Sequence, residues 1–300
     1  MRVAIAGGTG FIGSALKEAL LARNDEVWII SRKHAKTDSK RSGLNHLTWA
    51  EIEASPALLE GIDAIVNLSG ESINQRWTTA AKQRVMDSRI TAAARIAKLV
   101  QSLKQRPSLV LNASGISAYG ISADGIFDES SRTNVTDFLS EVVQKWELAA
   151  DSIPADRLVK LRVGVVLDKQ DGAFPLMAMP YRLFGGGRIG SGKQWLSWIH
   201  LTDMIRMILF ILDREEISGP VNGSSPEPVT NDTFGRAIGK AMGRPHWFPV
   251  PGFVMRTLFG EMSTLLLDGQ RALPRKAIEH GFSFRYPTVD SAMKELFGRN

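Results

Sequence analysis

The sequence contains no cysteine among its 300 residues. Disulfides, thiolate nucleophiles, iron–sulfur clusters and cysteine-based zinc sites are therefore excluded, and the chain suits a reducing compartment. Tyrosine is also scarce, with three residues, and the five histidines are dispersed without the spacing of metal ligands. We therefore expect no metal site.

Long apolar runs are missing as well. A membrane-spanning helix needs about 20 predominantly apolar residues, whereas the longest candidate, Ile205 to Leu212, is short and contains Arg206. Glycines from Gly7 onward break the apolar N-terminus, which therefore does not resemble a signal peptide. We expect a cytoplasmic protein without a membrane partner.

Charge of one sign is not concentrated anywhere. Lysine and arginine outnumber the acidic residues by 37 to 31, but they are scattered through the chain. This pattern suits a cationic surface or an anionic small molecule and lacks the basic stripe of a nucleic-acid binder. We expect a small-molecule substrate and no nucleic acid, and the sequence leaves open whether the protein is a monomer or a homodimer.

Short apolar runs alternate with helix-period segments over the first two hundred residues. The runs predict strands at 3–6, 27–30, 64–68, 109–111 and 158–167. The periodic segments predict helices at 11–23, from Thr78 or Thr79, and from Thr136 or Asp137. An irregular stretch precedes residue 64, and a loop spans 114–132. The alternation predicts an α/β fold with a doubly wound parallel sheet of the Rossmann type.

The pattern changes beyond about residue 170. Glycines gather between 185 and 192, and prolines interrupt short helical segments between 226 and 251. These features predict a smaller mixed α/β C-terminal lobe. We assign 1–163 plus about 199–223 to a dinucleotide-binding domain and 164–198 plus 224–300 to a substrate lobe at the strand ends, where ligands of open α/β sheets bind.

The first strand leads directly into a glycine-rich turn, GGTGFIG, and then into a helix. Glycine permits a tight turn and close approach to a pyrophosphate, while the helix N-terminus offers free N–H groups and the positive end of its dipole. The predicted cofactor contacts are Gly7, Thr9, Gly10, Phe11, Ile12 and Gly13.

The end of the second strand indicates which nicotinamide cofactor is preferred. A protein that binds NAD carries an acidic residue there for the ribose 2′-hydroxyl, whereas this chain has Ser31-Arg32-Lys33. A hydroxyl and a guanidinium suit a 2′-phosphate. We predict NADP(H) as the cofactor, with Ser31 and Arg32 as its selectors.

The Gly7-x-x-Gly10-x-x-Gly13 spacing resembles that of the extended short-chain dehydrogenase/reductases. Further segments resemble an atypical subgroup, the bacterial "epimerase family" proteins sometimes labelled nucleoside-diphosphate-sugar epimerases: NLSGES at 67–72, ASGISAYG at 113–120, FLSEVVQKWE at 138–147, SGKQWLSWIHLTD at 191–203 and GQRALPRKAIEHGF at 269–282. Together they cover both predicted lobes. With this resemblance, we expect Leu68, Ser69, Gly70 and Arg162 to complete the cofactor site.

The resemblance also implies a catalytic serine, a tyrosine, and a lysine four residues after that tyrosine. Ser114 occupies the place of the serine, but no Tyr-x-x-x-Lys occurs anywhere in the sequence. Leu139 and Val143 stand where the tyrosine and lysine are expected, and both fit an apolar helix face. Tyr119 is a candidate proton donor, with a packed loop tyrosine as the alternative.

Two interpretations of function follow. One is an NADP(H)-dependent oxidoreductase or epimerase acting on a small or nucleotide-linked substrate. The other is a non-catalytic NADP(H)-binding sensor or regulator. Arg162, Arg182, Arg188 and Lys193 are candidates for binding an anionic substrate group. In the second lobe, Trp195 and Trp198 are expected on one face of a short strand, either as pocket walls or as ordinary core. His200 is expected in a structural hydrogen bond at a helix start, with a catalytic role as the alternative.

Overall fold

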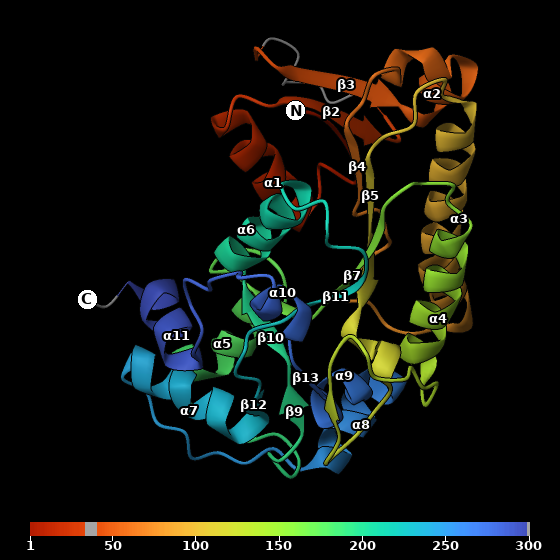
Figure 1. The fold of residues 1–300 in the computed structure, drawn as a ribbon. Coiled ribbons are helices and arrows are strands. Elements are labelled where there is room, and N and C mark those ends of the chain that lie inside the picture. The colour runs from red at the N-terminus through yellow and green to blue at the C-terminus, as the bar shows by residue number, and fades with distance from the viewer. Residues whose placement is uncertain (34–40, 299–300) are drawn as a thin grey trace.

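The structure, a computed structural model, describes residues 1–33 and 41–298. Its centre is a seven-stranded parallel sheet in the order β11-β7-β5-β4-β1-β2-β3 (Figure 1). The strands are β1 (Arg2–Ala6), β2 (Glu26–Ser31), β3 (Leu44–Thr48), β4 (Ala64–Asn67), β5 (Leu109–Gly115), β7 (Leu158–Val163) and β11 (Gly219–Gly223). From β1 the chain adds β2 and β3 on one side, then returns to the other side of β1 and adds β4, β5, β7 and β11. This is the doubly wound arrangement, so the predicted fold is confirmed.

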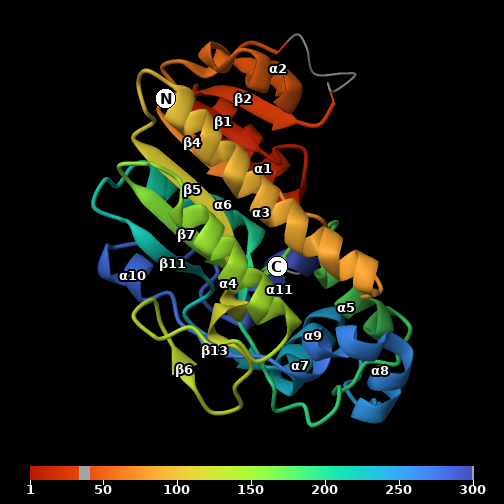
Figure 2. The same cartoon turned by 90° about the vertical axis from the view of Figure 1, so that its right-hand side faces the viewer.

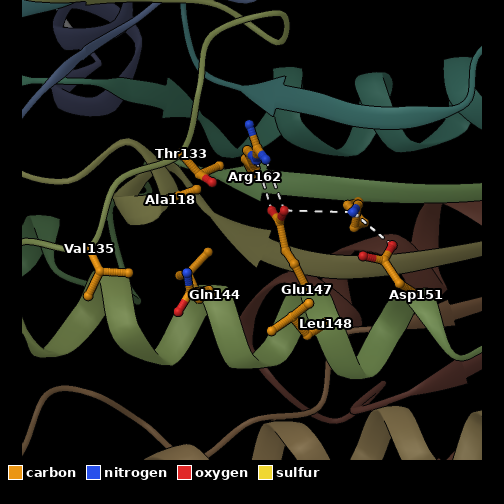
Figure 3. A pocket seen from close by; sticks show the side chains of 10 residues that line it. Ala118, Thr133, Val135, Gln144, Glu147, Leu148, Asp151 and Arg162 are labelled. Carbon is orange, nitrogen blue, oxygen red and sulfur yellow. Dashed lines mark hydrogen bonds and ion pairs between the residues drawn. The ribbon is translucent and has the colours of Figure 1, made fainter.

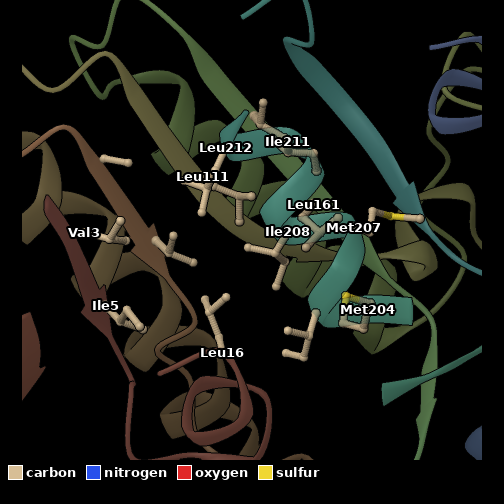
Figure 4. Close-up of a cluster of buried hydrophobic side chains, with 14 of the residues drawn as sticks. Val3, Ile5, Leu16, Leu111, Leu161, Met204, Met207, Ile208, Ile211 and Leu212 are labelled. Carbon is tan, nitrogen blue, oxygen red and sulfur yellow. The ribbon is translucent and has the colours of Figure 1, made fainter. Parts of the chain in front are cut away.

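Helices cover both faces of this sheet, as Figures 1 and 2 show. One face carries α1 (Phe11–Ala22) and α6 (Leu201–Leu212), and the other carries α2 (Trp49–Ala54), α3 (Thr79–Ser102) and α4 (Phe138–Asp151). Because side chains alternate along a strand, β1 sends Val3 and Ile5 to the first face and Ala4 and Ala6 to the second. Figure 4 shows Val3 and Ile5 with Leu16 and the side chains of α6 in the first core.

Side-chain caps fix where the long helices begin. The Thr78 hydroxyl accepts a hydrogen bond from the N–H of Ala81, and the Asp137 carboxylate accepts one from the N–H of Ser140. Of the two alternatives that the sequence offered for each helix, Thr78 and Asp137 are therefore the N-caps. Each cap satisfies an N–H group that would otherwise lack a partner.

Three sequence-based expectations are corrected. The predicted strand at 158–167 is two strands, β7 in the large sheet and β8 (Val165–Leu167) beside β10 (Trp198–His200). They separate at Gly164, where a Cβ atom would lie 2.7 Å from the carbonyl oxygen of Ser197. The strand predicted at 109–111 continues to Gly115, which shortens the expected loop. The stretch before residue 64 holds β3, α2 and a 3-10 helix (Pro56–Leu59).

The smaller lobe has its own core and three two-stranded sheets, β10–β8, β12–β9 and β13–β6. Their remaining strands are β6 (Ile126–Phe127), β9 (Trp195–Leu196), β10 (Trp198–His200), β12 (Val229–Thr230) and β13 (Arg271–Ala272). The helices are α5 (Phe174–Arg182), α7 (Asn231–Met242), α8 (Gly252–Phe259), α9 (Thr264–Leu267), α10 (Arg275–Glu279) and α11 (Val289–Phe297), with 3-10 turns at Ile116–Tyr119 and Gly260–Ser263. The predicted mixed α/β lobe is thus present.

Candidate functional site

The glycine-rich turn between β1 and α1 is held by close backbone packing. Gly7 has a φ of +81°, and a Cβ atom there would lie 2.8 Å from the carbonyl carbon of Leu68. A Cβ atom on Gly13 would lie 2.3 Å from the carbonyl oxygen of Gly7. Gly10 is different, because its only close neighbour would be that same oxygen, at 3.3 Å. Gly7 and Gly13 therefore serve the turn itself, whereas Gly10 leaves space on its outer side.

The N-terminus of α1 is bare. Its N-cap is Gly10, no side chain caps it, and the first turn contains no acidic residue. Thr9 and Gly10 are exposed, and Phe11 and Ile12 are half-buried. The N–H of Gly10 donates to the carbonyl oxygen of Gly7, whereas the N–H groups of the first turn that follows are not capped by any side chain in the described residues. With the positive end of the helix dipole, this is the arrangement that binds phosphate groups.

Two further segments lie at the same edge of the sheet, because β2 and β4 both pair with β1 in parallel. Ser31 ends β2, and its hydroxyl donates to the carbonyl oxygen of Lys33 at 2.6 Å. Arg32 is exposed. Hydrogen bonds from Gln75 and Arg84 lower the pKa of Glu71, and the charge of Arg32 contributes. The charge of Arg32 thus acts on Glu71 in the loop after β4, which also holds Leu68, Ser69 and Gly70.

Beyond β4, the ends of β5 and β7 enclose a buried polar network. Arg162 donates from Nε and Nη2 to the Glu147 carboxylate, at 2.8 and 2.9 Å. The Ser114 hydroxyl donates to Glu147 Oε1 at 2.6 Å. Burial raises the pKa of Glu147, but the hydrogen bonds and charge of Arg162 outweigh it and leave that pKa lowered. Glu147 is therefore a carboxylate in this network.

Tyr119 completes the network. Its hydroxyl donates to Asn222 Oδ1 at 2.8 Å, and its ring lies 5.0 Å from the Arg162 guanidinium carbon and stacks on Phe127. Burial raises the pKa of Tyr119, opposed in part by Arg162. The geometry is that of the packed loop tyrosine, the alternative that the sequence left open. The hydroxyls of Ser114 and Tyr119 both already have protein acceptors.

Leu139 and Val143 on α4, which stand where the tyrosine and lysine of the proton relay are expected, differ in burial. Val143 is 5% exposed, and a Cβ atom on Gly115 would lie 3.2 Å from its Cγ2. Leu139 is only half-buried, so the expected apolar face holds for Val143 and only in part for Leu139. Neither side chain can move a proton. A cavity of about 310 Å³ lies beside this part of the helix (Figure 3), lined by Ala118, Thr133, Val135, Val143, Gln144, Glu147, Leu148, Asp151, Lys160 and Arg162.

Sequence reasoning did not single out Glu147 or Arg89. Glu147 follows Val143 by four residues on the inward side of α4, and a charge in that position was the available signal. Arg89 lies on α3 beneath the loop after β4, where Nη1 donates to the carbonyl oxygens of Glu71 and Val85 at 3.0 and 2.9 Å. Burial lowers the pKa of Arg89 to about 10. Arg89 thus braces the loop that carries Gly70.

The second-lobe aromatics do not share a strand. Trp195 lies on β9, and its indole N–H donates to the carbonyl oxygen of Ala123. Trp198 is fully buried on β10, and its indole N–H donates to the carbonyl oxygen of Glu227. The expectation of one shared strand face is wrong, because the chain changes sheets at Ser197. His200 does make the expected hydrogen bond, accepting from the N–H of Thr202 at the start of α6.

No cluster of three His, Asp or Glu side chains suited to a metal ion occurs in residues 1–33 and 41–298. His34, one of the five histidines considered from the sequence, lies outside these residues. None of the helices that the structure describes is both long and apolar enough to cross a bilayer.

The strand order, the glycine-rich turn and the bare N-terminus of α1 together define an NAD(P)-binding fold of the short-chain dehydrogenase/reductase type. Comparison with known proteins agrees. Residues 3–139 match the NAD dependent epimerase/dehydratase family, and residues 250–296 match a domain of unknown function. The chain belongs to the epimerase family proteins.

Three similar proteins cover almost all of this chain. Epimerase family protein YfhF of Bacillus subtilis is 42% identical over 299 residues, which are 99% of this chain and 98% of that protein. The chloroplastic SDR39U1 homolog of Arabidopsis thaliana is 35% identical over 99% of this chain and 86% of its own length. A crystal structure of human epimerase family protein SDR39U1 with NADPH has a TM-score of 0.92 and 37% identity, covering 100% of both chains.

Proposed function

We propose that this protein binds NADP(H) and acts as an oxidoreductase or epimerase on a small or nucleotide-linked substrate, without a Tyr-x-x-x-Lys relay. The bare N-terminus of α1 behind the glycine-rich turn carries the proposal, since it presents free N–H groups to a pyrophosphate. The NADPH in the structure of the human relative supports the choice of cofactor. When bound, the nicotinamide would supply the hydride chemistry.

The proposed cofactor contacts fall into three groups. Thr9, Gly10, Phe11 and Ile12 would hold the pyrophosphate, with Gly7 and Gly13 shaping the turn. Ser31 and Arg32 would bind the 2′-phosphate, for which Arg32 is exposed and carries no ion pair in the described residues. The third group, Leu68, Ser69 and Gly70, would line the cofactor from the loop that Arg89 braces.

Arg162, Ser114 and Tyr119 lie on β7, on β5 and in the turn after β5, away from the glycine-rich turn, so we do not assign them to the pyrophosphate. Arg162 is held by Glu147, so it would contribute by keeping Ser114 and Tyr119 in place. The Tyr119 hydroxyl donates a hydrogen bond to Asn222 Oδ1. Transfer of its proton to a substrate would require this hydrogen bond to break. We also propose that the substrate lies between the two units 1–163 plus about 199–223 and 164–198 plus 224–300.

A second candidate function is a non-catalytic NADP(H)-dependent sensor or regulator. The engaged hydroxyls of Ser114 and Tyr119 favour it, together with the aliphatic side chains at 139 and 143. Such a protein would bind the cofactor and report its occupancy without transferring hydride.

Hydride transfer in single-turnover experiments separates the two candidates. We expect slow oxidation of NADPH with at least one carbonyl compound, or slow reduction of NADP⁺ or epimer formation with at least one nucleotide sugar, and slower turnover by the Ser114→Ala and Tyr119→Phe variants at unchanged NADPH affinity. Saturable NADPH binding without hydride transfer or epimer formation with any compound would favour the sensor. Absence of NADPH binding would contradict both.

A further inference from the structure

Exposed apolar side chains gather in the smaller lobe. Ten large apolar side chains in the described residues are at least half exposed: Ile126, Leu148, Leu176, Met179, Leu183, Phe184, Trp247, Phe248, Phe253 and Leu258. The last eight of these come from only two segments, 176–184 and 247–258. Exposed apolar groups are normal when they are scattered, but a concentration of this kind marks an interaction surface.

The two segments meet at one tip of the molecule. The N–H groups of Trp247 and Phe248 both donate to the carbonyl oxygen of Gly186, at 2.9 and 3.1 Å, and the Trp247 indole N–H donates to that of Phe184 at 2.9 Å. Figure 1 shows the chain between α7 and α8 running along the lower end of the molecule, at the opposite end from α2. We call Leu183, Phe184, Trp247 and Phe248 the apolar tip.

A polar chain fixes the base of the apolar tip. The Tyr181 hydroxyl lies 2.8 Å from His246 Nδ1, and His246 Nε2 lies 3.0 Å from Asp232 Oδ1. The His246 side chain is 8% exposed, whereas its neighbour Trp247 is 67% exposed. The backbone is therefore anchored from below while the aromatic rings project outward.

Basic side chains predominate around the apolar tip, although Asp232 lies beneath it and pairs with Arg236, and Lys240 pairs with Asp290. The stretches 172–202 and 233–260 contain no aspartate or glutamate, and their basic residues are Arg182, Arg188, Lys193, Arg236, Lys240, Arg244 and Arg256. The Arg244 guanidinium stacks on the Phe184 ring at 4.1 Å. Arg182 and Arg188 are exposed and form no ion pair within the described residues. They therefore remain free to bind an anionic surface.

From this juxtaposition we propose that the apolar tip docks the protein on the surface of bilayers that contain anionic lipids. Tryptophan and phenylalanine enter the headgroup boundary, and arginine pairs with lipid phosphates. Docking of this kind needs no long apolar run, so it is compatible with the lack of a spanning helix in the described residues, and it departs from the expectation of no membrane partner. A second copy of the chain fits less well, since a symmetric contact would bring the same basic residues face to face. The proposal is independent of the proposed function.

Vesicle sedimentation of the full chain tests the proposal. We expect binding to vesicles of phosphatidylcholine mixed with phosphatidylglycerol, weakening with salt, and little binding to phosphatidylcholine alone. The variant Phe184→Ser/Trp247→Ser removes two inserted rings, and Arg182→Gln/Arg188→Gln removes two charges. Each should lower partitioning about tenfold or more. The matched control Leu148→Ser changes an equally exposed side chain on α4 and should bind as the parent does.

Thermal melting shows whether each variant is folded, and all substituted positions are exposed. Three results would overturn the proposal: no binding to the anionic vesicles, equal binding to both vesicle types, or equal loss of binding in the Leu148→Ser control. A dimer in gel filtration that the Phe184→Ser/Trp247→Ser variant converts to a monomer would also overturn it, because a second copy would then occupy the apolar tip.

Discussion

The glycine-rich turn and helix α4 are two parts of one candidate site, yet they relate to the sequence in opposite ways. In the turn, the need for glycine at position 13 comes from nearby backbone, since a Cβ atom there would lie 2.3 Å from the carbonyl oxygen of Gly7. On α4, the residues that matter are defined by partners far away in the chain. The role of Glu147 depends on Arg162 and Ser114, and Lys160 adds an ion pair at 3.8 Å.

The difference teaches what to expect of each region under substitution. The turn is constrained by backbone atoms that cannot yield, so its tolerance differs sharply from one glycine to the next. The network on α4 is constrained by buried charge, so it tolerates a change of both partners better than a change of one.

The largest effect is expected at the turn and separates folding from binding. Gly13→Val places side-chain atoms against the backbone of Gly7 and should cost more than about 4 kcal/mol, enough to prevent folding. At Gly10, a Cβ atom would meet only the carbonyl oxygen of Gly7, at 3.3 Å. The Gly10→Val variant should therefore fold and lose NADPH binding. Melting curves and NADPH fluorescence titrations of both variants check this. A folded Gly10→Val variant that still binds NADPH would place the phosphate site elsewhere.

The next largest effect concerns the Glu147–Arg162 pair. Glu147→Gln leaves a buried guanidinium without its carboxylate and should lower the free energy of unfolding by about 3–5 kcal/mol. The double variant Glu147→Leu/Arg162→Met removes both charges and should be more stable than the single variant. Urea unfolding of the three proteins measures this, and a double variant less stable than Glu147→Gln would show that the network is not limited by unpaired charge.

The Glu147–Arg162 pair also predicts how the stability of the protein depends on pH. Because the pKa of Glu147 is lowered in the folded protein, its contribution to stability is present above the ordinary glutamate pKa of about 4.3. It is lost as the pH falls through the lowered value. Below pH 4.3 the melting temperature of the parent should therefore fall more steeply than that of Glu147→Gln. Parallel curves would contradict an ionised Glu147.

A smaller effect distinguishes the two relay positions. Val143→Lys buries an ammonium group and should cost about 1–3 kcal/mol, reduced where the adjoining cavity admits water. Leu139→Tyr changes a half-buried position and should cost less than about 1 kcal/mol. Melting temperatures of the single and double variants test the order. A Val143→Lys variant as stable as Leu139→Tyr would show that position 143 does not belong to the core.

Much of the fold could be predicted from the sequence, because hydrophobic period and helix caps are local signals. The strand ending at Ala6, the second strand to within one residue at each end, the helix after Thr78 and the parallel sheet all follow from such signals. The break at Gly164 does not, since it lies where the fold brings the carbonyl oxygen of Ser197 beside Gly164 and into a hydrogen bond with the N–H of Val165. Tyr119 shows the same limit at the site: its hydrogen bond to Asn222 joins residues 103 positions apart, which no local pattern reports.

Calorimetric titration with NADPH and NADH tests the central claim, which is that the turn and the end of β2 form an NADP(H) site. We predict that NADPH binds more tightly by at least about 1.4 kcal/mol, or tenfold. Arg32→Ala should reduce the ratio of the two affinities. The control Arg95→Ala removes an exposed cation of α3 that pairs with Glu53 of α2, and it should leave the ratio unchanged. Equal affinities in the parent protein, or a ratio unchanged by Arg32→Ala, would contradict the account.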